Sequence, residues 1–261
     1  MLHLRTQAAR PVSRAAAETG GAGPFQINPD LDLGALAQAY EAEGRVRIYG
    51  LLADGAVQLH QYFESCADWI HLINTDDGVL ELDRAERARM SARRWAAIES
   101  GAQARARDAF QYRYEALRVP DDDEWGAGDD LLSGFARLMQ SGPMLDLLRA
   151  VTGHAELAFT DGQATAYGPG DFLTGHDDDV AGKNRLAAYV FGLTPGWRLE
   201  WGGLLLFHGP HDRTVTGMAP RFNTLDLFKV PQRHSVSQVT AAAPHRRYAV
   251  TGWLRAGGRR P

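Results

Sequence analysis

Residues 157–193 of the 261-residue chain read LAFTDGQATAYGPGDFLTGHDDDVAGKNRLAAYVFGL, and this stretch decides the fold class. It contains two runs rich in apolar and aromatic residues, at 157–167 and 185–193, which are separated by Gly, Pro and Asp. Such runs bounded by turn residues are typical of short β-strands. Comparable runs recur further along the chain, at 203–208, 224–229, 235–239 and 247–254. Several short strands interrupted by turns predict a β-sandwich or a barrel.

The region that precedes these strands has a mainly helical pattern. Leu33, Leu36 and Tyr40 recur at helical spacing, and Gly44 ends that run. Residues 45–49 (RVRIY) alternate polar and apolar side chains, which predicts a short strand. Further helices are expected at 54–69, at 84–110 and at 131–151, the last interrupted near a Gly-Pro pair.

The order of these elements predicts an α+β fold, because helices that precede a set of strands usually pack on one face of a mainly antiparallel β core. We expect a mainly helical support region and a β core within one domain, flanked by two flexible tails. The four expected segments are a tail at 1–24, the support region at 25–155, the β core at 156–255 and a second tail at 256–261.

The composition excludes several classes of protein. Hydrophobic residues make up 44% of the chain and charged residues 23%, as in ordinary globular proteins. The net charge of −4 is spread along the chain, so no basic face for nucleic acid is expected. No apolar run approaches the roughly 20 residues of a membrane span. We therefore expect no nucleic-acid or membrane partner, and the oligomeric state cannot be predicted.

The cysteine content and the first residues indicate a location. Cys66 is the only cysteine, so no disulfide within the chain can form, which fits a reducing compartment. Residues 1–24 are rich in Ala, Arg and Gly and lack the apolar core of a secretory signal. We therefore expect a cytoplasmic protein.

The segment Gly175-His176-Asp177-Asp178-Asp179 is a candidate metal site. On an extended segment the side chains of His176 and Asp178 would point to the same face, because side chains alternate with period two. The motif alone is weak, since adjacent aspartates more often mark a solvated turn. A later strand-forming segment, QRHSVSQV, contributes His234. Two histidines and one carboxylate leave three coordination positions open, which suits ferrous iron with a bidentate co-substrate and O2, whereas structural zinc would need further Cys or His ligands.

Arg247 opens the last apparent strand, RYAVTGWL, in which Ala249, Thr251 and Trp253 share its face. The planar guanidinium would suit the distal carboxylate of a dicarboxylic co-substrate, with Thr251 facing the same cavity. Taken alone, Arg247 is better explained as a surface ion-pair residue, and Arg246 is the other basic candidate for the anchor.

These motifs occur in an ordered series: YGPGDFL at 167–173, HDD at 176–178, WGGLLLF at 201–207, APRFN at 219–223, His234, and RYAVTGW at 247–253. The series resembles the prolyl-hydroxylase branch of the 2-oxoglutarate- and Fe(II)-dependent oxygenases, which includes hypoxia-factor and ribosomal-protein prolyl hydroxylases. The resemblance covers about 157–255 closely and the helical half more loosely.

The resemblance implies a double-stranded β-helix, or jelly roll, supported by N-terminal helices on one sheet. It implies that His176, Asp178 and His234 are the iron ligands and catalytic residues. Arg247 matches the residue that binds the distal carboxylate of 2-oxoglutarate, while Thr251 and Tyr167 match residues that line the co-substrate pocket. The carboxylate of Asp178 favours hydroxylation, because halogenating relatives lack it.

Two positions depart from the family pattern. Gly192 stands where some prolyl hydroxylases place a tyrosine that contacts the co-substrate, and Leu204 stands where the family commonly has glutamate. Both departures concern the details of the pocket and the choice of substrate.

The resemblance predicts a dioxygenase that uses Fe(II), 2-oxoglutarate and O2, with ascorbate as a reductant, and that releases succinate and CO2. The expected substrate is a prolyl residue or a proline-like molecule. A free amino acid or a biosynthetic small molecule is the alternative for the same chemistry. The contrasting hypothesis is a non-catalytic jelly-roll binding module, against which the intact ligand set and Arg247 argue.

Two further segments are weaker candidates. The segment 208–212 (HGPHD) has metal-ligating residue types, but a Gly-Pro loop at the barrel rim explains it better. The acidic run 121–124 is interpreted as a solvated loop, or as a loop near the cavity mouth that would select a basic substrate.

Overall fold

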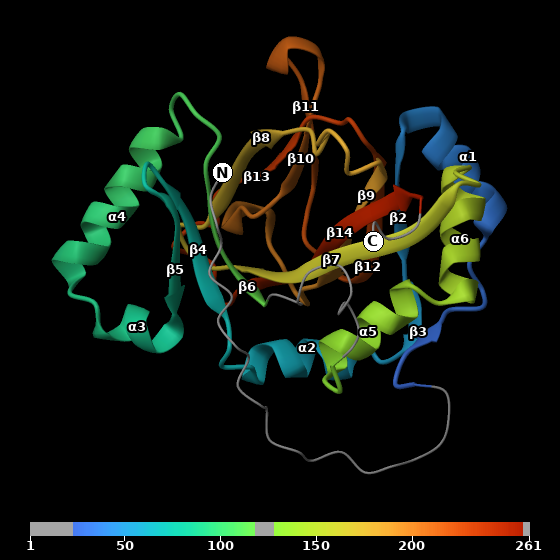
Figure 1. Cartoon of the computed structure of the whole chain (residues 1–261), viewed down its shortest axis with the longest axis horizontal. Helices are drawn as coiled ribbons and strands as arrows, with labels where there is room; N and C mark the ends of the chain where they lie inside the picture. The colour runs from blue at the N-terminus through green and yellow to red at the C-terminus, as the bar shows by residue number, and fades with distance from the viewer. Residues whose placement is uncertain (1–22, 118–127, 258–261) are drawn as a thin grey trace.

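One curled antiparallel sheet contains most of the strands of the computed structural model, which describes residues 23–117 and 128–257 (Figure 1). Along the sheet the strands follow the order β11 (Val215–Met218), β10 (Leu205–His208), β13 (His234–Val236), β8 (Phe172–His176), β6 (Tyr112–Leu117), β7 (Leu157–Tyr167), β14 (Arg247–Ala256), β9 (Arg185–Leu193), β12 (Phe222–Lys229) and β2 (Arg45–Tyr49). The strands β8, β10, β11 and β13 arch over the layer formed by β7, β14, β9 and β12 (Figure 1). The α+β fold with a jelly-roll core is therefore confirmed.

Four more strands complete the β structure. They are β4 (Ile70–Thr75), which pairs with β6, β5 (Gly78–Asp83), which pairs with β4, and the two-stranded pair of β1 (Gln26–Ile27) with β3 (Leu52–Asp54).

Six α-helices surround the sheet: α1 (Leu33–Glu43), α2 (Ala56–Ser65), α3 (Arg84–Arg89), α4 (Ala92–Arg105), α5 (Leu131–Met139) and α6 (Gly142–Thr152). Two short 3-10 turns lie at Leu199–Trp201 and Pro210–Asp212. Helices α1, α2, α5 and α6 gather below and to the right of the sheet, and α3 and α4 flank β4 and β5 on the left (Figure 1). None of the helices within 23–117 and 128–257 is long and apolar enough to cross a membrane.

Local sequence explains where these helices begin and end. The carboxylate of Asp32 accepts a hydrogen bond from the backbone N–H of Ala35, and Gly44 ends α1 in the left-handed conformation. The expected single helix at 84–110 is two helices, because Met90 and Ser91 are extended and the Ser91 hydroxyl caps α4. The long-helix prediction was therefore wrong at that junction.

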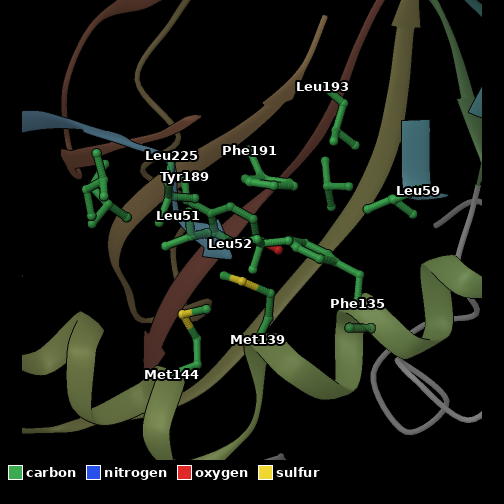
Figure 2. Close-up of a cluster of buried hydrophobic side chains, with 14 of the residues drawn as sticks. Leu51, Leu52, Leu59, Phe135, Met139, Met144, Tyr189, Phe191, Leu193 and Leu225 are labelled. Atoms are coloured by element: carbon green, nitrogen blue, oxygen red, sulfur yellow. The ribbon is translucent and has the colours of Figure 1, made fainter. Parts of the chain in front are cut away.

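The core lies between the helices and one face of the sheet. Phe135 of α5 stacks on Phe191 of β9 with ring centroids 4.8 Å apart. Figure 2 shows Met139 and Met144 pointing from the helices toward the same cluster. Each fully buried side chain of this size stabilises the fold by about 1.5–3 kcal/mol. Because the helices cover this face of the sheet, the other face is left to line the interior of the jelly roll.

The region 25–155 differs from the expected pattern in one respect that matters for the site. It contributes strands as well as helices, and β6 lies between β7 and β8, inside the sheet of the β core. The sequence of β6, YRYEAL, places tyrosines on one face and ionic residues on the other, and this strand was not among those expected.

The expected tails and the acidic run fall partly or wholly outside the described residues. Residues 1–22, the run 121–124 and residues 258–261 are not among them. Ala256 was expected in the C-terminal tail, but it is the last residue of β14, where it pairs with Leu157 of β7.

Candidate metal and co-substrate site

Three side chains converge at one end of the jelly roll, two from neighbouring strands and one from the turn that follows β8. His176 ends β8 and lies directly opposite His234, which begins β13. Oδ1 of Asp178 lies 3.5 Å from Nε2 of His176, and Oδ2 of Asp178 lies 3.4 Å from Nε2 of His234. The three potential ligand atoms all lie within 4.8 Å of one another. The structure thus brings the three predicted ligands to a single point.

Asp178 reaches this point by a different route from the one expected. Its φ of +64° places it in the left-handed region, so the segment after His176 is a turn and not a continued strand. The assumption that His176 and Asp178 share a face of an extended segment was therefore wrong. Asp tolerates the left-handed conformation better than most residues, although that conformation still costs about 1–2 kcal/mol.

Hydrogen bonds fix the tautomers of both histidines. Nδ1 of His176 lies 3.1 Å from the carbonyl oxygen of Thr174, and Nδ1 of His234 lies 2.7 Å from the carbonyl oxygen of Gln232. Because a carbonyl oxygen only accepts, both Nδ1 atoms carry the proton and donate. Both Nε2 lone pairs therefore face the carboxylate, as in histidines that ligate metals.

The electrostatics of His234 also favour ligation. Burial, and then the neighbouring charge of His176, lower the pKa of His234 to about 4. The ring is therefore neutral at neutral pH and can donate its lone pair to a cation.

The donor set fits ferrous iron. Two imidazole nitrogens and one carboxylate oxygen form the three-ligand set that leaves half of an octahedron open. Among the described residues, His176, Asp178 and His234 are the one group of three or more His, Cys, Asp or Glu side chains that lie close enough together to hold a metal ion. The alternative at 208–212 does not form such a group, because His208 donates or accepts hydrogen bonds with Asp212 (2.9 Å) and Ser235 (2.7 Å).

The ligands line a cavity of about 260 Å³ inside the jelly roll. Arg247, Thr251 and Tyr167, the predicted co-substrate residues, line the same cavity. The remaining lining residues are neutral: Phe110, Tyr112, Tyr114, Gln163, Thr165, Leu173, Ala188, Tyr189, Val190, Leu205, Phe228, Val236, Gly252 and Trp253. All six predicted site residues therefore meet in one chamber.

Arg247 is a buried cation that has no acidic partner among the described residues. Only 4% of its surface is exposed, and its guanidinium lies 5.1 Å from the ring centroid of Tyr167. Within 23–117 and 128–257, no carboxylate forms an ion pair with it, and burial lowers its pKa. A buried charge without a counter-ion is costly, which indicates that an anion belongs in this part of the cavity.

The neighbouring charges are already paired. Asp226 accepts two hydrogen bonds from Arg47, at 2.5 and 2.7 Å. Arg246, the alternative anchor, pairs with Glu115 through a 2.6 Å hydrogen bond and does not line the cavity. These pairings leave Arg247 as the guanidinium available to an anion in the chamber.

Several cavity residues were missed by the sequence reasoning. Tyr112 and Tyr114 come from β6, and Tyr114 stacks on Tyr167 with ring centroids 5.2 Å apart. Gln163 donates a hydrogen bond to the hydroxyl of Tyr114. The alternation of aromatic and charged residues at 112–115 is the signal that could have identified this wall.

Gly192 and Leu204, the two positions that depart from the family pattern, lie in different surroundings. A Cβ at Gly192 would clash with the backbone carbonyl oxygen of Arg221, so no larger residue fits there. Leu204 does not line the cavity. The co-substrate pocket is therefore built without the tyrosine that some prolyl hydroxylases have at the position of Gly192.

Comparisons with known proteins agree with this geometry. The family model described as the 2OG-Fe(II) oxygenase superfamily matches residues 162–255, which include all six predicted site residues. No protein of curated function matches the sequence significantly.

Solved structures share the fold at low sequence identity. A prolyl-4-hydroxylase from Pseudomonas putida is 18% identical with a TM-score of 0.52, and the match covers 87% of this chain and 100% of that one. A prolyl hydroxylase from Trichoplax adhaerens, solved with a hypoxia inducible factor peptide fragment, is 15% identical with a TM-score of 0.55, covering 86% and 89%. A non-heme α-ketoglutarate-dependent epimerase from nogalamycin biosynthesis is 13% identical with a TM-score of 0.52, covering 88% and 83%.

Proposed function

We propose that this chain, whose residues 162–255 match the 2OG-Fe(II) oxygenase superfamily, hydroxylates a C–H bond of a prolyl residue or a proline-like substrate. The reaction would consume 2-oxoglutarate and O2 and form succinate, CO2 and an alcohol. The observation that carries the proposal is that Arg247, which pairs with no carboxylate of the described residues, is buried in the same cavity as His176, Asp178 and His234.

The protein residues would bind and orient the reactants. Iron, 2-oxoglutarate and O2 supply the oxidising chemistry when bound. The imidazoles of His176 and His234 would hold iron through Nε2, and the carboxylate of Asp178 would compensate part of its charge.

Arg247 would bind the distal carboxylate of 2-oxoglutarate. Each hydrogen bond from a guanidinium to a carboxylate contributes about 1.5–3 kcal/mol. Tyr167 lies beneath the guanidinium, and Thr251 offers a hydroxyl to the same chamber. Because Arg247 has no other acidic partner in the described residues, the incoming carboxylate would displace no existing ion pair.

The rest of the cavity wall supports an uncharged substrate group. With Asp178 committed to iron and Arg247 to the co-substrate, the remaining lining residues carry no charge. Phe110, Tyr112 and Trp253 offer aromatic faces to which the C–H bonds of a pyrrolidine ring are complementary. That prolyl hydroxylases share this fold is consistent with such a substrate.

A small-molecule substrate is the alternative for the same chemistry. An α-ketoglutarate-dependent epimerase from nogalamycin biosynthesis shares the fold at a similar level, which supports this alternative beside the prolyl one. We also propose ascorbate as the reductant that keeps the iron ferrous, and a cytoplasmic location.

A substrate screen tests the proposal. Protein reconstituted with Fe(II) and 2-oxoglutarate would be incubated with proline-containing peptides, free proline and other amino acids, and the products examined by mass spectrometry. We expect a product with one added oxygen from a prolyl or proline-like compound, and none with the His176→Ala variant. Oxygen incorporation only into unrelated small molecules would overturn the prolyl assignment.

A further inference from the structure

Arg185 contacts both the backbone and the side chain of the candidate iron ligand Asp178. Its Nη1 donates a 2.9 Å hydrogen bond to the backbone carbonyl oxygen of Asp178 and lies 3.7 Å from Oδ1 of the same residue. The Arg185 side chain is only 14% exposed. The guanidinium therefore lies behind the ligand, in a position to act on it.

The strained backbone of Asp178 needs a contact that holds it in place, such as the hydrogen bond from Arg185. Its left-handed backbone is strained for a residue with a Cβ, and the aspartates on either side of it differ in burial from it. Asp177 and Asp179 are exposed, whereas Asp178 is half-buried, and the backbone N–H of Asp179 donates a hydrogen bond to the carboxylate of Asp177. Among the hydrogen bonds of this turn, the one from Arg185 holds the carbonyl oxygen of Asp178 itself.

Arg185 is in turn held by a rigid surface. Its guanidinium lies over the indole of Trp253, 3.5 Å from the ring centroid. Trp253 is on β14, where its backbone N–H donates to the carboxylate of Asp161 at 3.2 Å. Arg185 therefore reaches Asp178 from a fixed position on the opposite layer of the jelly roll.

The number of open iron positions depends on how Asp178 coordinates. If one carboxylate oxygen binds, a six-coordinate ion keeps three positions, enough for bidentate 2-oxoglutarate and O2. If both oxygens bind, only two positions remain. Both oxygens of Asp178 now face a histidine Nε2, so the side chain alone does not decide between the two modes.

We propose that Arg185 is a positioning residue that holds Asp178 in its left-handed turn and engages Oδ1, so that the metal is bound through Oδ2 alone. This inference rests on the proposed iron site. It assigns to Arg185 a role that requires both its charge and its planar, stacked guanidinium.

Metal binding without turnover tests the proposal. The affinity for Mn²⁺ would be measured by calorimetry for the wild type and for Arg185→Gln, Arg185→Lys and Arg255→Gln, and the anaerobic Fe(II) forms would then be titrated with 2-oxoglutarate. Arg255→Gln is the matched control, because Arg255 pairs with Asp161 on the same rim but makes no ion pair with Asp178.

Loss of an outer partner of a metal ligand typically weakens metal affinity about 10–100-fold. We expect a loss in this range for Arg185→Gln, a smaller loss for Arg185→Lys, and a change of less than about twofold for Arg255→Gln. The melting temperature of the metal-free protein should change little in Arg185→Lys, while its stabilisation by metal decreases.

The outcomes separate this inference from the proposed function. Failure of the wild type to bind metal would refute the proposed iron site. Wild-type binding with unchanged affinity in both Arg185 variants, or an equal loss in Arg255→Gln, would refute the role of Arg185. If Arg185→Gln does not fold, the metal affinity of Arg185→Lys decides.

Discussion

Replacing Arg247 with methionine should weaken 2-oxoglutarate binding while stabilising the protein without ligand. Arg247 is buried, and no carboxylate in the described residues pairs with it, so it is an uncompensated charge until an anion arrives. A methionine of similar length fills the same space without that desolvation cost. Replacing buried ionic groups by apolar ones often stabilises a protein by about 1–4 kcal/mol. We therefore expect a higher free energy of unfolding for the ligand-free variant.

The same substitution should weaken the binding of 2-oxoglutarate, although it stabilises the ligand-free protein. Two hydrogen bonds from the guanidinium to one carboxylate contribute roughly 3 kcal/mol or more, and each 1.4 kcal/mol corresponds to a factor of ten in affinity. The apparent KM for 2-oxoglutarate should then rise by roughly 100-fold or more. Arg247→Lys keeps the positive charge but loses the planar, two-pronged guanidinium, so its KM for 2-oxoglutarate should lie between those of the wild type and Arg247→Met.

The assay is succinate formation as a function of 2-oxoglutarate concentration, with chemical denaturation of the same variants to measure stability. Arg246→Met is the matched control, because Arg246 pairs with Glu115 away from the cavity and its loss should leave the KM unchanged. An unchanged KM in Arg247→Met would refute the reasoning. So would a KM that rises only in Arg246→Met, which would move the anchor to the neighbouring residue.

Three further perturbations have defined outcomes. His176→Ala and Asp178→Ala should abolish turnover with a native circular dichroism spectrum, and retained activity would remove either residue from the ligand set. Because burial lowers the pKa of His234 to about 4, the unfolded chain binds a proton between pH 6.5 and 4 that the folded metal-free protein does not. The metal-free protein should therefore lose up to roughly 3 kcal/mol of stability as the pH falls through this range, and a flat denaturation profile in wild type, or an equal loss in His234→Gln, would contradict the assignment. Gly192→Ala should destabilise the fold, because the added Cβ would clash with the Arg221 carbonyl, and a melting temperature equal to that of wild type would contradict this.

Much of the fold could be predicted from local sequence. The alternation at 45–49, the strands at 157–167 and 185–193 and the helix ended by Gly44 occur at the expected positions, because each depends on side-chain periodicity or on a backbone conformation that glycine favours. The strand β6 could not be placed in the same way. Its partners β7 and β8 are distant in sequence. Its charged residues are buried because Arg84 and Arg246 pair with Glu115, and Asp171 pairs with Arg113.

The candidate site shows a similar division. The residue types of His176, Asp178 and His234 pointed to one metal because their chemistry limits the ions that they can hold. The left-handed turn at Asp178, the guanidinium of Arg185 behind it and the tyrosine wall from β6 depend on contacts between separate strands. No local pattern encodes such contacts, so these parts required the structure.

The central claim is that one cavity holds both iron and 2-oxoglutarate. The most direct measurement is succinate formation from 2-oxoglutarate by the purified protein with Fe(II), O2 and ascorbate, compared between the wild type and the His176→Ala variant. We expect succinate from the wild type, even without a second substrate, and none from the variant. A wild-type protein that binds neither Fe(II) nor 2-oxoglutarate, or a variant that forms succinate at the same rate, would contradict it.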